Sequence, residues 1–132
     1  MAIKRFGVSL EASTLDTLDE LVEKNNLPNR SRAIRFLIEK YAIEKKWECN
    51  NEVAGAIVLV YDHHKKDMNN RLLEIQHEFH NLILAVQHVH LNHDNCLETI
   101  TVKGKAVELT ALADKLIGIK GIRHGKLVMT ST

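Results

Sequence analysis

The chain has few aromatic residues, little net charge and no long apolar run. Aromatic residues make up 5% of its 132 residues, which argues against a large aromatic core or a base-stacking surface for nucleic acid. The 18 basic and 17 acidic residues leave a formal net charge of +1, which argues against a polybasic coat or an acidic tail. No apolar run reaches the roughly 18 residues that span a bilayer.

Export signals and a disulfide framework are also lacking. Residues 1–10 contain no apolar stretch followed by a cleavage site, so no secretory signal is visible. The two cysteines, Cys49 and Cys96, are therefore better read as free thiols or metal ligands than as a disulfide. We expect a cytoplasmic protein. A chain this short with few large side chains is also expected to bury further surface by forming oligomers.

Histidine is the residue that stands out. All eight histidines lie at or after His63, and seven of them fall between His63 and His93. The rest of the composition is that of an ordinary globular protein. One histidine-dense window in such a chain points to a functional site.

Residues 1–48 predict a small domain of one strand and two helices. Apolar and non-apolar residues alternate over residues 5–10, as in a strand. Apolar residues at helical spacing follow over residues 15–22 and again over residues 34–42. Asn29 and Ser31 are both suitable N-cap residues for the second helix. A lone strand has nothing to pair with, so we expect two chains to form a ribbon-helix-helix dimer.

A ribbon-helix-helix dimer places its two-stranded ribbon in the DNA major groove. The alternation turns Phe6, Val8 and Leu10 inward. It turns a second set outward, toward base edges: Arg5, Gly7 and Ser9. Arg30 and the backbone N–H groups near Ser31 are expected to meet phosphate at the start of the second helix.

The second domain is predicted over residues 53–132, after a polar linker at residues 45–51. Strands are expected at residues 55–61, 82–91, 96–103 and 122–129, and helices at residues 67–80 and 106–118. This βαββαβ order is the ferredoxin-like pattern. The whole chain is therefore predicted to be an α+β protein, with a ribbon-helix-helix (βαα) domain followed by a ferredoxin-like domain.

A metal site is predicted from His88, His90 and Cys96. Residues two apart on a strand face the same side, so His88 and His90 project together. A short polar turn then brings Cys96 back beside them on the next strand. Two imidazoles and a thiolate suit zinc, copper or nickel, and a flat four-coordinate arrangement would select copper(II) or nickel(II).

The fourth ligand is expected from another subunit. His77 and His80 share a helix face, but that helix ends where the next strand begins. His88 lies six residues further along this strand, about 20 Å away at 3.3 Å per residue. We therefore expect His77 of a neighbouring chain to complete the site. Glu98 and His63 are candidates to orient the ligands, with His93 and Asp94 near enough in sequence to contribute.

The chain resembles the nickel-responsive transcriptional regulators over nearly its whole length. The central likeness is the run His88-Val89-His90-Leu91-Asn92-His93-Asp94 with Cys96-Leu97-Glu98. Further matching segments are residues 5–10, 29–31, 33–35, 61–63, 76–77, 103–104 and 123–125.

This resemblance implies a homotetramer, in which two ribbon-helix-helix dimers flank a metal-binding core. It implies one Ni(II) per subunit, held in a square plane by His88, His90 and Cys96 with His77 of another subunit. It also implies that nickel favours binding to operator DNA and represses nickel-uptake genes.

Two other classes of function stay open from the residues alone. One is a ribbon-helix-helix module of antitoxin type, or one that senses another metal or a small ligand. If its C-terminal domain binds a protein or a small ligand, its DNA affinity would not depend on Cys96. A zinc enzyme or metal carrier would need an open coordination position and a nearby general base. The four ligands expected here fill the site, which disfavours an enzyme.

Overall fold

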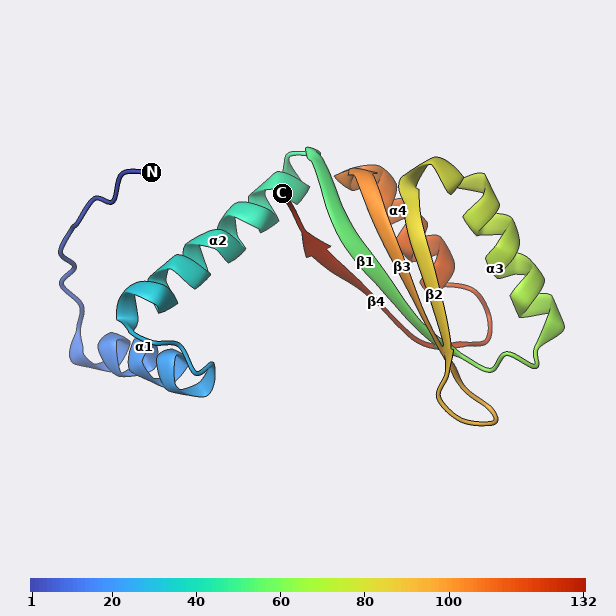
Figure 1. Cartoon of the computed structure of the whole chain (residues 1–132), viewed down its shortest axis with the longest axis horizontal. Coiled ribbons are helices and arrows are strands. Elements are labelled where there is room, and N and C mark those ends of the chain that lie inside the picture. The colour runs from blue at the N-terminus through green and yellow to red at the C-terminus, as the bar shows by residue number, and fades with distance from the viewer. The chain divides into compact units, whose positions relative to one another are not determined.

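The computed structural model describes all residues, 1–132, and they form two compact units, residues 1–41 and 42–132. The first unit contains α1 (Ala12–Lys24) and most of α2 (Arg30–Glu48) (Figure 1). Asn29 is the N-cap of α2, because its Oδ1 accepts the backbone N–H of Arg32 at 2.9 Å. None of the helices has the length and apolar character that spanning a lipid bilayer requires.

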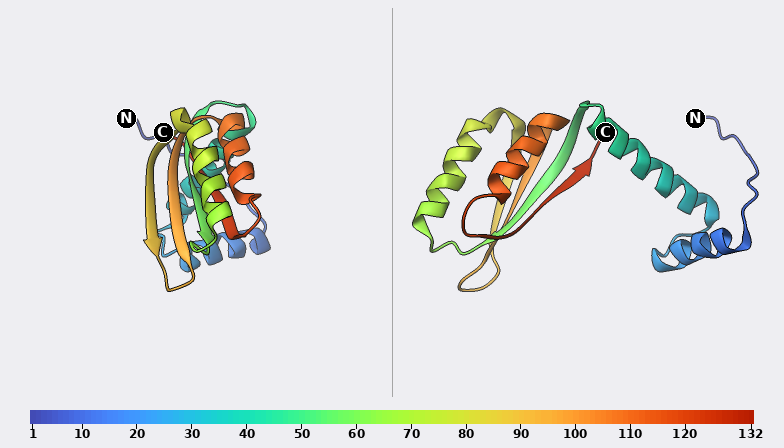
Figure 2. Two further views of the ribbon diagram at one scale, coloured as in Figure 1. Left: turned by 90° about the vertical axis from the view of Figure 1, so that its right-hand side faces the viewer. Right: turned by 180° about the vertical axis from the view of Figure 1, so that it is seen from behind.

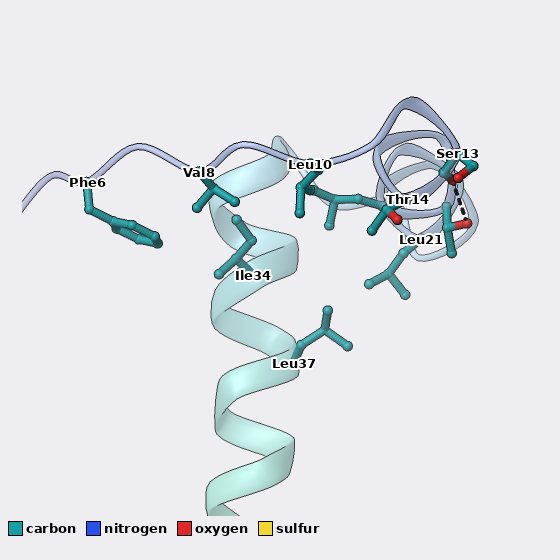
Figure 3. Close-up of a pocket in the computed structure, with 10 residues that line it drawn as sticks. Phe6, Val8, Leu10, Ser13, Thr14, Leu21, Ile34 and Leu37 are labelled. Atoms are coloured by element: carbon teal, nitrogen blue, oxygen red, sulfur yellow. Dashed lines mark hydrogen bonds between the residues drawn. The ribbon is translucent and has the colours of Figure 1, made fainter.

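The strand predicted over residues 5–10 is not formed in the single chain. Residues 1–11 have no regular secondary structure. A strand is defined by its hydrogen bonds to a neighbour, and the single chain offers this segment no neighbouring strand. The apolar alternation is nevertheless visible, since Phe6, Val8 and Leu10 point to the same side (Figure 3).

The linker predicted at residues 45–51 is wrong over its first four residues, because α2 continues to Glu48. Trp47 explains this extension. Its side chain is buried in the core of the second unit, and its indole Nε1 donates to the carbonyl of Thr130 at 3.1 Å. Asn50 then reverses the chain at a φ of +54°, and β1 begins at Glu52.

The second unit is a four-stranded antiparallel sheet with two helices on one face (Figure 2). The sheet has the order β2-β3-β1-β4. Its elements, in chain order, are β1 (Glu52–Tyr61), α3 (Lys66–Glu78), a 3₁₀ turn (His80–Leu82), β2 (Ile83–His90), β3 (Cys96–Lys105), α4 (Ala106–Ile117) and β4 (Ile122–Thr130). The βαββαβ order and the α+β class predicted from the sequence are confirmed.

The core lies between the sheet and helices α3 and α4. Buried and less buried residues alternate along β1 and the first part of β3, as expected for strands with one covered face. Ile57, Leu59, Ile100, Leu109 and Leu112 are fully buried in this layer. The opposite face of the sheet has no helix on it (Figure 2).

Candidate metal centre

The centre lies at one end of the sheet, where three strands present side chains to the helix-covered face. In the antiparallel register His88 pairs with Glu98 and His90 pairs with Cys96. Cys96 also pairs with Tyr61 at the end of β1. Directly paired residues project to the same side. The register therefore brings the histidines of β2 and the cysteine of β3 together.

Three donor groups from different elements converge here: His63, His90 and Cys96. Their ligand atoms all lie within 4.8 Å of one another. The His88 ring is next, with its centroid 5.3 Å from that of His90, and it stacks on the Tyr61 ring at 6.0 Å. His90 and Cys96 therefore lie together in a single chain, and the second imidazole beside them is that of His63, which the sequence placed in a supporting role. His88 instead pairs with Glu98 across the strands.

The electrostatics of the donors suit a metal ion. Burial raises the pKa of the Cys96 thiol, although the backbone N–H of His63 donates to the sulfur and opposes that effect. Burial and the neighbouring imidazoles lower the pKa of His63, which keeps it neutral and able to act as a ligand. Its Nδ1 is buried without a hydrogen-bond partner. An unpaired buried nitrogen beside a thiol fits a centre of nitrogen and sulfur ligands.

Glu98 is held firmly beside these donors. Its side chain is only 8% exposed. The Tyr61 hydroxyl donates to one carboxylate oxygen at 2.9 Å, and the Gln76 amide donates to the other at 2.7 Å. Burial and the Glu98 charge raise the pKa of Tyr61 well above its usual range, so its hydroxyl keeps the proton that it donates.

Sequence reasoning did not single out Tyr61 and Gln76 for this role. Both precede predicted site residues closely, Tyr61 two residues before His63 and Gln76 directly before His77. Their contacts depend on the pairing of β1 with β3 and on the packing of α3 over the sheet. Neither the strand pairing nor the helix packing can be predicted from the local spacing of residues.

His77 lies apart from this cluster within one chain. It sits in the last turn of α3, beside His80 at a ring-centroid distance of 5.9 Å. The end of α3 leads into the start of β2, whereas His88 and His90 lie at the other end of that strand, next to the hairpin loop (Figure 1). One chain therefore does not bring His77 to the other three predicted ligands.

The residues predicted to contact DNA lie in the first unit. Arg5, Gly7 and Ser9 are exposed in the N-terminal segment, and Ser31 is in the first turn of α2. Arg30, which is predicted to contact phosphate, is paired with Asp19 in the single chain. Its Nε and one Nη donate to the two carboxylate oxygens of Asp19 at 2.8 and 3.0 Å. The remaining Nη has no such partner.

An open apolar groove of about 710 Å³ lies between the N-terminal segment and the two helices of this unit (Figure 3). Its walls include Phe6, Val8, Leu21, Ile34 and Leu37. The side chains of Phe6 and Val8 are 74% and 55% exposed. The inward-facing set predicted from the alternation is therefore left uncovered by the single chain.

Comparison with known proteins decides the family. The NikR C-terminal nickel-binding domain matches residues 54–130, and the ribbon-helix-helix protein family of copG type matches residues 4–45. A nickel-responsive regulator of Desulfovibrio desulfuricans is 49% identical over 98% of this chain and 94% of its own length. A nickel-responsive regulator of Geobacter sulfurreducens is also 49% identical, over 97% of this chain and 93% of its own length. The chain belongs to the nickel-responsive regulators.

Membership of the nickel-responsive regulators confirms the resemblance seen in the sequence, and it excludes an enzyme. Solved structures support the fold of the second unit. An uncharacterized protein of Thermotoga maritima matches with a TM-score of 0.56 at 20% identity, over 61% of this chain and all of its own. The ACT domain of a GTP pyrophosphokinase of Chlorobium tepidum matches with a TM-score of 0.50 at 18% sequence identity. The match covers 59% of this chain and all of that domain.

Proposed function

We propose that this nickel-responsive regulator is a cytoplasmic repressor of nickel-uptake genes, and that it binds operator DNA as a homotetramer carrying one Ni(II) per subunit. The observation that carries the proposal is the cluster of imidazoles and a buried thiol at one end of the sheet, with His77 at the other end. The match of residues 4–45 to ribbon-helix-helix proteins supports the DNA-binding half.

The proposed ligands are His88, His90 and Cys96 of one subunit and His77 of a neighbouring subunit. Ni(II) prefers a flat, four-coordinate set of nitrogen and sulfur ligands. The pairing of β2 with β3 holds the first three ligands on one face. Glu98 faces His88 across the strands, where its fixed carboxylate can accept the second ring N–H of a ligating histidine. His63 lies beside Cys96 and orients its sulfur.

A site shared between subunits gives nickel a means of acting on DNA binding. The full ligand set exists only in those arrangements of the tetramer that bring α3 of one subunit to β2 of another. Nickel then favours these arrangements by its binding free energy. Operator binding increases when the favoured arrangement also sets the two DNA-binding dimers to the spacing of the operator half-sites.

The DNA-binding dimer is proposed to form by antiparallel pairing of residues 6–10 of two chains. The second copy covers the apolar groove described above, which the single chain leaves open. Arg5, Gly7 and Ser9 then face base edges in the major groove. Ser31 at the start of α2 offers backbone N–H groups to phosphate, and Arg30 adds its free Nη.

Operator binding with and without nickel tests this function. A library of random-sequence duplex DNA is enriched on the nickel-loaded protein, and the selected duplex is then titrated by fluorescence anisotropy. We expect stoichiometric Ni(II) to raise the DNA affinity of the wild type and to leave that of Cys96→Ala unchanged. His124→Ala is the control and should respond like the wild type. An affinity that does not depend on nickel would overturn the proposal.

Subunit sharing is tested by mixing two inactive variants. His77→Ala keeps the three strand ligands, and Cys96→Ala keeps His77. Each alone should lack the thiolate-to-nickel absorption band. Unfolding the two together and refolding the mixture should restore part of the band, because mixed tetramers contain complete sites. A full band in His77→Ala alone, or no recovery in the mixture, would show that the site is not shared.

A further inference from the structure

The last two turns of α2 belong to the second unit, although the helix starts in the first. The boundary between the units falls between Tyr41 and Ala42, inside a helix that runs without a break from Arg30 to Glu48. Ile43 and Trp47 pack in the core of the second unit. The chain therefore passes from one unit to the other within a helix, and not in a loop.

The end of α2 is closed by a Schellman motif. Asn50 has a left-handed conformation, with a φ of +54°, and its N–H donates to the carbonyl of Trp47. The N–H of Asn51 donates to the carbonyl of Lys46. This ending satisfies carbonyl groups that a helix otherwise leaves without partners. The last turn of α2 is therefore a fixed structure, and it does not fray.

The turn that ends α2 also caps the start of α4. Asn50 Oδ1 accepts the backbone N–H of Val107 at 2.9 Å, and the carbonyl of Asn51 accepts that of Ala106 at 3.0 Å. Lys105, the residue before α4, provides no side-chain cap. The turn thus supplies acceptors that the first turn of α4 lacks. The end of α2 cannot move away without exposing these donors.

The end of β4 is bonded to α2 as well (Figure 1). The Trp47 indole donates to the carbonyl of Thr130, and Lys46 Nζ donates to Ser131 Oγ at 3.4 Å. Trp47 is 7% exposed, so water cannot replace the partner of its indole N–H. The end of α2 is therefore held by both β4 and α4 of the second unit.

The other end of β4 reaches the hairpin that carries the metal centre. Arg123 donates to Asn95 Oδ1 at 2.6 Å, directly before Cys96. Between its two ends β4 pairs with β1, from Ile122 to Thr130. One strand of the sheet therefore connects the metal-binding hairpin to the end of α2.

We propose that Trp47 and Asn50 are positioning residues for nickel-dependent DNA binding. With Lys46 they form a clamp that fixes the end of α2 to the second unit. This inference rests on the proposed function, in which nickel favours one arrangement of the subunits. A DNA-binding unit on a loose connection does not follow that arrangement, so nickel then binds without changing the DNA affinity. The clamp sets how strongly the two binding events are coupled.

Paired variants open the clamp with little other change. Trp47→Phe removes the indole N–H and keeps an aromatic ring in the core. Asn50→Gly removes the acceptor for Val107 and tolerates the left-handed backbone. Asn50→Asp keeps an acceptor oxygen at this position and is the matched control. Leu116→Val changes a fully buried residue in the last turn of α4, and it controls for a general loss of stability.

Two titrations of the full-length protein measure the coupling. The operator duplex selected above is titrated with metal-free and with nickel-loaded protein, and Ni(II) is titrated with and without that duplex. We expect Trp47→Phe/Asn50→Gly to reduce the nickel-induced rise in DNA affinity by about tenfold. The DNA-induced rise in nickel affinity should fall by the same factor, because coupling is reciprocal. The thiolate band, the nickel affinity without DNA and the DNA affinity without nickel should match the wild type.

The controls separate a role in coupling from a role in stability alone. Asn50→Asp and Leu116→Val should both respond to nickel like the wild type. An unchanged nickel response in the double variant would overturn the proposal. An equal loss of response in Leu116→Val would attribute the effect to stability, and a lost thiolate band in the double variant would attribute it to the metal centre. Either result would also overturn the proposal.

Amide hydrogen exchange separates a failure of the clamp from a failure of the proposed function. In the metal-free wild type we expect the amides of residues 47–51 and of Val107 to be protected, and in the double variant to exchange faster. Rapid exchange of these amides in a wild type that responds to nickel would overturn the clamp alone. Slow exchange in a wild type whose DNA affinity ignores nickel would instead overturn the proposed function, and the coupling role of the clamp with it.

Discussion

The side chains around the metal centre constrain one another through a few buried polar contacts. Glu98 is the clearest case, because its buried carboxylate depends on donors from Tyr61 and Gln76. A buried carboxylate that loses a donor costs more free energy than a surface group, since water cannot replace the missing hydrogen bond. Residues that never touch a metal can therefore control the stability of this region.

Tyr61→Phe should lower the free energy of unfolding of the metal-free protein by about 1–2 kcal/mol, because it removes the hydroxyl that donates to Glu98. Urea unfolding followed by circular dichroism measures the change. Tyr41→Phe is the matched control, since Tyr41 is 65% exposed. Equal effects of the two substitutions would show that the Tyr61–Glu98 contact contributes nothing.

Nickel binding should release about one proton from Cys96. Burial raises the pKa of this thiol, so it stays protonated at neutral pH in the metal-free protein, and the metal must displace the proton. The apparent nickel affinity should therefore rise about tenfold for each pH unit while the free thiol is protonated and the histidines are neutral. Calorimetry in buffers of different ionisation enthalpy counts the protons. A pH-independent affinity would contradict this assignment.

Among the elements, α2 depends most visibly on a single capping residue. Asn29→Ala should destabilise the first unit by about 1 kcal/mol, because it removes the side-chain oxygen that accepts the N–H of Arg32. Thermal unfolding measures the loss. Asn29→Asp keeps an acceptor at that position and should restore most of the stability. If Asp is as destabilising as Ala, the cap is not the cause.

The strands and helices of the second unit could be predicted because their signals are local. A short, nearly continuous apolar run marks β1, and leucines at helical spacing mark α4. The end of α2 could not be predicted, since residues 45–48 look like a polar linker until Trp47 finds its place in the core. The strand at residues 5–10 fails for the opposite reason. Its pattern is clear, but its hydrogen-bond partner is not in the single chain.

The metal centre shows the same difference between local signals, which could be predicted, and contacts between distant segments, which could not. His88 and His90 could be grouped with Cys96 because one strand and one short turn join them. The approach of His63 to His90 depends on β1 and β2 both being placed relative to β3, which no local spacing specifies. The contact of His64 with His93 also joins two loops that are distant in sequence. Spacing therefore grouped the candidate donors on one hairpin and named His63 as a supporting residue, but it did not predict how closely His63 approaches His90.

At the scale of the whole molecule, the uncovered face of the sheet favours an oligomer. Val89 pairs with Leu97 and Val128 pairs with Ala56, and these pairs project away from the buried face of the sheet. The side chains of Val89 and Val128 are 43% and 48% exposed. Apolar side chains gathered on an open sheet face usually mark a surface that another protein covers. The second copy required by the proposed function is the natural candidate.

Val89→Lys should therefore shift the protein from tetramers toward dimers, because a charge buried between two apolar faces has no partner to compensate its lost hydration. Sedimentation velocity at several protein concentrations measures the shift. Val107→Lys is the matched control: Val107 is 64% exposed in the first turn of α4, on the opposite side of the sheet. It should leave the mass unchanged. An unaltered tetramer in Val89→Lys would place the subunit contact elsewhere, and a wild-type monomer would remove the tetramer itself.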